Sequence, residues 1–166
     1  MSRAFTKEPD GDMVADDTPE RPRSEHPNHV TPAGLAALEA RRAGLAAERA
    51  AQAAAGLQGK PALAHAEREL RYFDARIEDA IGVDPATQPA GEVRFGARVT
   101  VADEAGRARD FTLVGEDEAD AAAGKVSWLS PLARALAGGR IGDLVTWRRP
   151  AGDLELEITA IVYSRD

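Results

Sequence analysis

Hydrophobic residues between positions 63 and 80 recur at alternating spacings of three and four, which is the heptad pattern of a coiled-coil seam. They are Leu63, Ala66, Leu70, Phe73, Ile77 and Ala80. An earlier stretch, from Thr31-Pro32 to about Gln52, is rich in strong helix formers, and its first two residues suit a helix cap and first turn. Two glycines and Pro61 interrupt the helical pattern between these stretches. The sequence therefore predicts an antiparallel coiled-coil hairpin over residues 30–82.

The second half of the chain has the alternating pattern of half-buried strands instead. Strands are predicted at 93–101, 107–114, 125–129, 144–149 and 154–162. Between the third and fourth, Ser130 is placed to cap a short helix that begins at Pro131 and stops at Gly138. Residues 83–91, rich in proline and glycine, are predicted to be a linker. Residues 92–166 then form a mainly antiparallel sheet with one short helix, so that the fold class is α+β.

Residues 1–29 differ from both regions in composition. They hold four prolines, many acids and few large apolar residues. Such a segment buries too little apolar surface to offset the entropy of ordering, so a disordered acidic tail is predicted. His26 and His29 stand three apart in it, but no further histidine and no cysteine lie nearby. A metal site needs three or four ligands, and we therefore expect neither a metal nor a cofactor.

Charge and composition exclude several functional classes. Residues 1–30 carry 7 acids and 4 bases, residues 31–82 carry 7 of each, and residues 83–166 carry 14 acids and 10 bases. No segment has the basic excess of a protein that grips phosphates, so stable nucleic-acid binding is not expected. The chain has no cysteine, no apolar run long enough to span a membrane and no signal-peptide core. We expect a cytoplasmic monomer.

Four short motifs follow one another in a fixed order in the C-terminal region. They are Phe95-Gly96, the run from Val114 to Asp120, the run from Ser130 to Leu136, and Gly142-Asp143. Together they resemble the C-terminal domain of the bacterial Gre (GreA/GreB) transcription elongation factors, whose fold is FKBP-like. The preceding helical hairpin also fits that family. The resemblance implies a regulator of elongation that docks at the rim of the RNA polymerase secondary channel and pushes its hairpin toward the active centre.

The docking surface of the family lies around the loop that enters the Ser-Pro helix. The resemblance thus assigns partner binding to a set of residues at that loop and in the following helix. They are Trp128, Leu129, Ser130, Pro131 and Arg134. Leu129 occupies a place where GreB-like members carry an acid, which favours apolar burial over an ion pair. The structural alternative is that Ser130 and Pro131 only start a helix and that Trp128 fills the core.

The hairpin tip departs from the pattern of the Gre factors that stimulate transcript cleavage. Those factors carry two acids there, which help to hold a second magnesium ion in the polymerase active centre. An ungapped alignment through Ala75-Arg76-Ile77 puts glycines at both acidic positions. The tip residues are Gly56, Leu57, Gln58, Gly59 and Lys60. We therefore predict a polymerase-binding protein that is not an enzyme and does not stimulate cleavage.

Two other interpretations compete with this one. An FKBP-like interaction module could bind another protein, as the related nucleoside diphosphate kinase regulators are thought to do in part. Prolyl isomerase activity is disfavoured, because it needs an open pocket lined by aromatic residues and the aromatics here mostly hold alternating, core-like positions. The acidic run Glu116–Asp120 lacks the ligand spacing of a calcium loop and is predicted to be a solvated turn.

Overall fold

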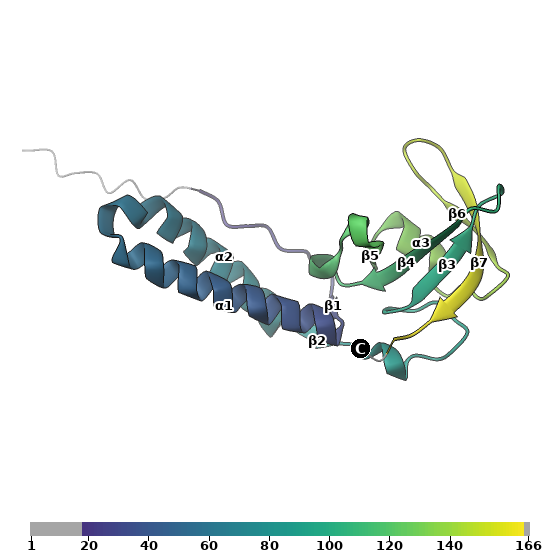
Figure 1. Cartoon of the computed structure of the whole chain (residues 1–166), viewed down its shortest axis with the longest axis horizontal. Helices are drawn as coiled ribbons and strands as arrows, with labels where there is room; N and C mark the ends of the chain where they lie inside the picture. Colours follow the sequence, from purple (N-terminus) through teal and green to yellow (C-terminus); the bar gives the residue numbers. More distant parts are fainter. Residues whose placement is uncertain (1–17, 165–166) are drawn as a thin grey trace, which may run out of the picture.

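The computed structural model describes residues 18–164, and it places an elongated helical hairpin end to end with a compact sheet domain (Figure 1). The hairpin consists of α1 (Pro32–Ala54) and α2 (Lys60–Glu78), which are joined by a 3-10 turn, η1 (Gly56–Gly59). The predicted helical hairpin is therefore confirmed. Its second helix is shorter than predicted, because the chain leaves the helical conformation after Glu78.

The start of α1 follows from its first residues. Thr31 has an extended backbone and accepts a hydrogen bond from Gly34 N at 2.9 Å, while Pro32 occupies the first turn. Along the hairpin, Leu38 and Leu45 are the buried leucines of α1, and Ala66 and Leu70 are buried on α2. The remaining seam leucines and aromatics are half-buried, because two helices alone cannot enclose a complete core.

Two short strands that the sequence pattern did not reveal close the base of the hairpin. β1 (Asn28–Val30) precedes α1, β2 (Ala80–Gly82) follows α2, and the two pair in parallel. Strands of three residues are too short to show a period of two. Residues 18–27 run along α2 as an extended segment (Figure 1). The prediction of disorder for residues 1–29 therefore fails for residues 18–29, while residues 1–17 lie outside the described part of the chain.

The sheet domain contains five strands in the order β5-β4-β3-β7-β6. Their bounds are β3 (Arg98–Ala102), β4 (Ala108–Val114), β5 (Lys125–Ser127), β6 (Leu144–Trp147) and β7 (Leu154–Val162). Three of the pairings are antiparallel, but β5 runs parallel to β4, so the sheet is mixed rather than purely antiparallel. The connection from β4 causes this difference: it leads out to the hairpin through η3 (Glu116–Glu118) and η4 (Ala121–Ala123), then re-enters alongside β4.

A single core lies between the sheet and α3 (Pro131–Leu136). Its fully enclosed members come from the strands, from α3 and from the segment before β3. They are Val93, Ala97, Val99, Val101, Leu113, Leu132, Ala133, Leu136, Leu156 and Ile158. The α+β class is confirmed. Within residues 18–164, no helix combines the length and the apolar character needed to cross a membrane.

The segment predicted to be a linker packs against the sheet domain. Asp84 caps a short 3-10 turn, η2 (Pro85–Thr87), by accepting a hydrogen bond from Ala86 N at 2.8 Å. Pro85 is buried, and any side chain at Gly96 would collide with its ring. Gly96 also has a φ of 84°, which turns the chain before β3. The first strand of the sheet domain, β3, therefore begins at Arg98 and not at Val93, where the sequence pattern placed it.

Substitution of Gly115 tests the close contact between the two parts of the molecule. Its backbone (φ −66°, ψ 165°) suits any residue, but a Cβ there would overlap the carbonyl oxygen of His29. We expect Gly115→Ala to lower the free energy of unfolding by about 1–3 kcal/mol, measured by guanidinium denaturation. Gly44→Ala is the control: it lies in α1 with open space around it and should raise stability by about 0.5–1 kcal/mol. Equal effects of the two substitutions would contradict the steric explanation.

Candidate functional site

The loop between β5 and α3 is held rigidly by its own backbone. Leu129 N donates to Ser127 Oγ at 3.2 Å, and Ser130 N donates to the carbonyl oxygen of Ser127 at 2.9 Å. Ser130 Oγ accepts a hydrogen bond from Ala133 N at 3.2 Å and so caps α3, and Pro131 occupies the first turn. The structural role proposed for these two residues is thus present, and it leaves their outer surfaces available.

The five residues predicted at this loop do not share one environment. Pro131 and Arg134 are exposed, whereas Leu129 and Ser130 are half-buried. The exposed part of this stretch, at the start of α3, offers a proline ring and a guanidinium, next in sequence to a half-buried aliphatic side chain. Such a mixture suits a protein partner better than a small ligand, because the aliphatic and ring surfaces can be buried while the cation remains at the rim.

Trp128 belongs to an aromatic cluster rather than to the central core. Its ring meets His29 edge to face at a centroid distance of 4.9 Å and Phe95 at 6.5 Å, and the latter two rings are 5.8 Å apart. His29 comes from β1 and Phe95 from the turn before β3, so three distant segments converge here. His29, weighed above only as a metal ligand, is therefore part of the wall that Trp128 helps to form.

An open cavity of about 470 Å³ lies at this aromatic cluster. Its other lining residues include Val93 and Gly138. Trp128 Nε1 and His29 Nδ1 are buried and have no hydrogen-bond partner within residues 18–164. Buried polar nitrogens are usually paired, so these two are exceptions, and their burial leaves the aromatic wall of the cavity apolar.

The hairpin tip lies far from this loop, at the opposite end of the rod (Figure 1). The 23 residues of α1 correspond to about 35 Å of helix. Gly56 has a φ of 63°, and a Cβ at Gly59 would collide with the carbonyl oxygen of Gln52. The two glycines aligned with the acids of cleaving factors thus sit where a side chain is strained or excluded. Leu57, 79% exposed, projects from the tip, and Lys60 begins α2.

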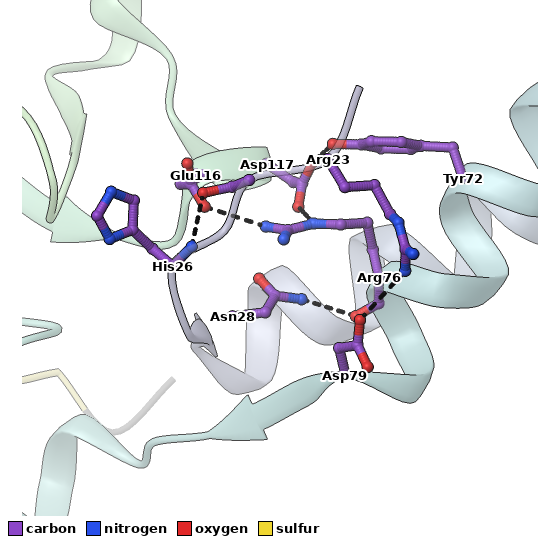
Figure 2. A network of polar contacts seen from close by, with 9 residues as sticks. Arg23, His26, Asn28, Tyr72, Arg76, Asp79, Glu116 and Asp117 are labelled. Carbon is purple, nitrogen blue, oxygen red and sulfur yellow. Dashed lines mark hydrogen bonds and ion pairs between the residues drawn. The ribbon is translucent and has the colours of Figure 1, made fainter. Parts of the chain in front are cut away.

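The acidic run that follows β4 joins the hairpin to the sheet domain (Figure 2). Arg76 of α2 is only 3% exposed. Its Nε lies 2.6 Å from Asp117 Oδ2, and its Nη2 lies 3.5 Å from Glu116 Oε2. Tyr72 donates its hydroxyl to the other oxygen of Asp117 at 2.7 Å. The solvated turn predicted for this run is therefore wrong, because its carboxylates pair with side chains 41 and 45 residues away.

Glu118 makes the second connection between the two parts. One of its oxygens accepts a hydrogen bond from Thr31 Oγ1 at 2.6 Å, and the other lies 3.4 Å from Lys125 Nζ. Thr31 is itself the cap of α1, and a side chain at Gly34 would collide with the Glu118 carboxylate. Both helices of the hairpin are therefore tied to the same loop, α1 through Glu118 and α2 through Asp117.

Two further groups complete the base of the hairpin. Asn28 of β1 is buried and donates its side-chain NH₂ to the carbonyl oxygen of Arg76 at 2.7 Å (Figure 2). Burial raises the pKa of Tyr72 to about 12, and its hydrogen bond to Asp117 acts in the same direction. Arg76, Asp117, Glu118 and Tyr72 were not identified as functional residues from the sequence.

The C-terminal part of the chain matches a family model. Residues 88–163 match the model described as transcription elongation factor, GreA/GreB, C-terminal. The GreB elongation factor of Neisseria meningitidis serogroup B is 41% identical over 108 residues, which cover 64% of this chain and 66% of that protein. The GreA factor of Alkalilimnicola ehrlichii is 46% identical over 110 residues, which cover 60% of this chain and 70% of that protein. The chain thus spans about two thirds of the length of these relatives.

Solved structures of the same kind are similar over most of the chain. A prokaryotic GreA/GreB elongation factor from Nitrosomonas europaea has 23% sequence identity and a TM-score of 0.42, covering 82% of this chain and 99% of that one. The GreA factor homolog Gfh1 of Thermus thermophilus has 20% identity and a TM-score of 0.40, with coverages of 82% and 99%.

Removal of the Arg76 side chain tests whether this ion pair holds the molecule together. In Arg76→Ala the Asp117 carboxylate, whose side chain is 13% exposed, would lose its cation. We expect the free energy of unfolding to fall by about 3–5 kcal/mol, measured by denaturant unfolding. Arg98→Ala removes an exposed pair with Asp110 and should cost about 1 kcal/mol or less. A loss at position 76 no larger than at position 98 would show that the buried pair is not a principal contact.

Tyrosine titration tests the environment of Tyr72. An unfolded tyrosine has a pKa of about 10, and the pKa of Tyr72 is raised to about 12 in the folded state. Its contribution to stability is therefore complete below about pH 10 and is lost as the pH rises toward 12. Phenolate absorbance should show a component near pH 12 that Tyr72→Phe removes and Tyr163→Phe retains. If Tyr72→Phe leaves this component in place, the assignment is incorrect.

Proposed function

The chain belongs to the GreA/GreB family of transcription elongation factors, and from this premise we propose that it binds RNA polymerase at the secondary channel and regulates elongation. The observation that carries the proposal is the C-terminal match, which includes the Ser-Pro loop and the acidic run in their family order. The elongated hairpin supports it, because a rod of about 35 Å can enter a channel while the sheet domain stays outside.

Docking is proposed to use the surface from Trp128 to Arg134. Pro131 and Leu129 supply apolar contact area, and Arg134 is free to meet an acidic group of the polymerase rim. Leu129 stands where GreB-like members carry an acid, so contact at that point is apolar. Trp128 supports the loop from beneath through His29 and Phe95, and the adjoining cavity can take an apolar side chain of the partner.

The chain is further proposed to regulate elongation without stimulating transcript cleavage and without catalytic residues of its own. A second magnesium ion needs carboxylate oxygens, and the turn from Gly56 to Gly59 carries none. Both aligned glycines sit where a side chain would be strained or would collide. A monomer acting in the cytoplasm would then exert its effect by occupying the channel and competing with cleaving factors.

A second candidate function rests on the cavity beside Trp128. An interaction module related to nucleoside diphosphate kinase regulators would use this cavity to hold a different protein. The aromatic wall of this cavity favours a partner that presents an apolar side chain. Recovery of polymerase subunits from a lysate by the tagged chain favours the first function, and recovery of another protein without them favours the second.

Binding to purified RNA polymerase tests the proposed function directly. We expect the chain to displace a fluorescent, cleavage-competent Gre factor from polymerase and to slow its cleavage of backtracked transcripts. Arg134→Glu should weaken displacement about tenfold, since it reverses an exposed charge at the docking surface. Arg148→Glu, at an arginine after β6 that is also exposed, is the matched control and should change displacement less than twofold.

Three results would contradict parts of this proposal. Absence of displacement at saturating concentrations rules out the shared docking site. Equal effects of the substitutions at positions 134 and 148 rule out the assigned surface. Transcript cleavage that depends on the added chain, in the absence of any other Gre factor, rules out the non-cleaving role.

A further inference from the structure

Residues 18–27, here called the strap, run along α2 in the same direction as the helix (Figure 1). Three ion pairs join them. Glu20 Oε1 lies 2.6 Å from Arg71 Nη2, Arg21 Nη1 lies 3.1 Å from Glu69 Oε2, and Arg23 Nη1 lies 3.4 Å from Asp79 Oδ2. Each of these three charges of the strap is therefore matched by an opposite charge on α2 or, for Arg23, on Asp79 just after it.

Aromatic contacts add to these pairs. The guanidinium of Arg21 lies over the ring of Tyr72 at 3.8 Å from its centroid and 5.7 Å from that of Phe73. The two rings are themselves packed edge to face at 5.3 Å. The strap thus covers aromatic faces of the hairpin as well as its charges.

The strap is held much less firmly than the base of the hairpin. The side chains of its ion pairs are 44–63% exposed, apart from Glu69, and exposed pairs contribute little and are screened by salt. The chain immediately after the strap is fixed, because Asn28 and Val30 are buried and β1 pairs with β2. An open cavity of about 670 Å³ lies between the strap and the base of the hairpin. Its lining includes Arg23 and His26 of the strap, and Arg76 and Asp79 (Figure 2).

The N-terminal segment therefore has a fixed part, β1, and a part that can be released, the strap. The strap borders an open cavity, so lifting it breaks no buried contact of the core. What it uncovers is the hairpin face that it contacts, which comprises two aromatic rings and charges of both signs on α2, and Asp79 just after the helix. The members of this face are Glu69, Arg71, Tyr72, Phe73 and Asp79.

We propose that the strap masks this face of the hairpin and that the face binds a protein surface of RNA polymerase once the strap lifts. The inference rests on the proposed function. A protein is the occupant that the chemistry favours, because Glu69 and Asp79 repel phosphates while aromatic faces and mixed charges suit a polypeptide. The strap would block such a partner, because three of its charged residues pair with the charges of this face and Arg21 covers the rings.

Release of the strap can be measured without polymerase. In the full chain, trypsin can cut after Arg23, whereas Arg21 is followed by Pro22 and is resistant. The variant E20Q/R21Q removes two ion pairs and the ring contact but keeps Arg23. We expect cleavage between Arg23 and Ser24 to be about tenfold faster at low salt. The control R41Q/E48Q, which removes an exposed ion pair on α1, should leave this rate unchanged.

Polymerase affinity then tests the masking. If the face is available only in strap-open molecules, E20Q/R21Q should bind polymerase about tenfold more tightly than the unsubstituted chain, and the control should not. The advantage should shrink as salt is raised, because salt opens the strap of the unsubstituted chain as well. Faster cleavage with unchanged or weaker binding would overturn the masking, and unchanged cleavage would overturn the releasable strap. Failure of the unsubstituted chain to bind polymerase at all would instead refute the proposed function, while the protease result would still report on the strap.

Discussion

The ion pair between Arg76 and Asp117 is the contact on which the arrangement of the two parts depends. A guanidinium removed from water is strongly destabilising unless a carboxylate meets it at close range. Arg76 is 3% exposed, so the loop after β4 must bring Asp117 to it. This requirement explains why the chain leaves the sheet between β4 and β5 and returns in parallel, and why Gly115 approaches the carbonyl oxygen of His29 so closely. The direction of the hairpin relative to the loop between β5 and α3 follows from the same contact.

Local patterns predicted most of the fold because they depend on neighbouring residues. Thr31-Pro32 and Ser130-Pro131 start helices as expected, and the heptad spacing and strand alternation located both helices and five strands. The misses are non-local. β1 and β2 are three residues each and stabilise one another only when the hairpin brings them together. The ordering of residues 18–29 depends on side chains about 50 residues away, which composition cannot reveal.

The candidate site divides in the same way. The residues around Ser130 could be located from the order of family motifs, whereas His29 and Phe95 join Trp128 only through the tertiary fold. The acids after β4 were predicted to form a solvated turn because most of their partners lie 41 to 87 residues away, and Lys125, seven residues after Glu118, is the local exception. One sequence signal was available: Arg76 directly precedes Ile77 of the predicted seam, and a cation beside a buried seam implies an acid elsewhere in the chain.

The hairpin joins a base that is fixed by buried contacts to a tip that has no acidic residue. The turn from Gly56 to Gly59 has no ionisable group, and Lys60, the last of the five tip residues, is their one cation. The direction of the hairpin relative to the sheet domain is set at the base, where the buried Arg76 pair joins α2 to the loop after β4. The exposed ion pairs of the strap join it to the hairpin alone, so they do not fix that direction. The residues that fix the direction of the hairpin therefore lie at the opposite end of the rod from its tip, about 35 Å away.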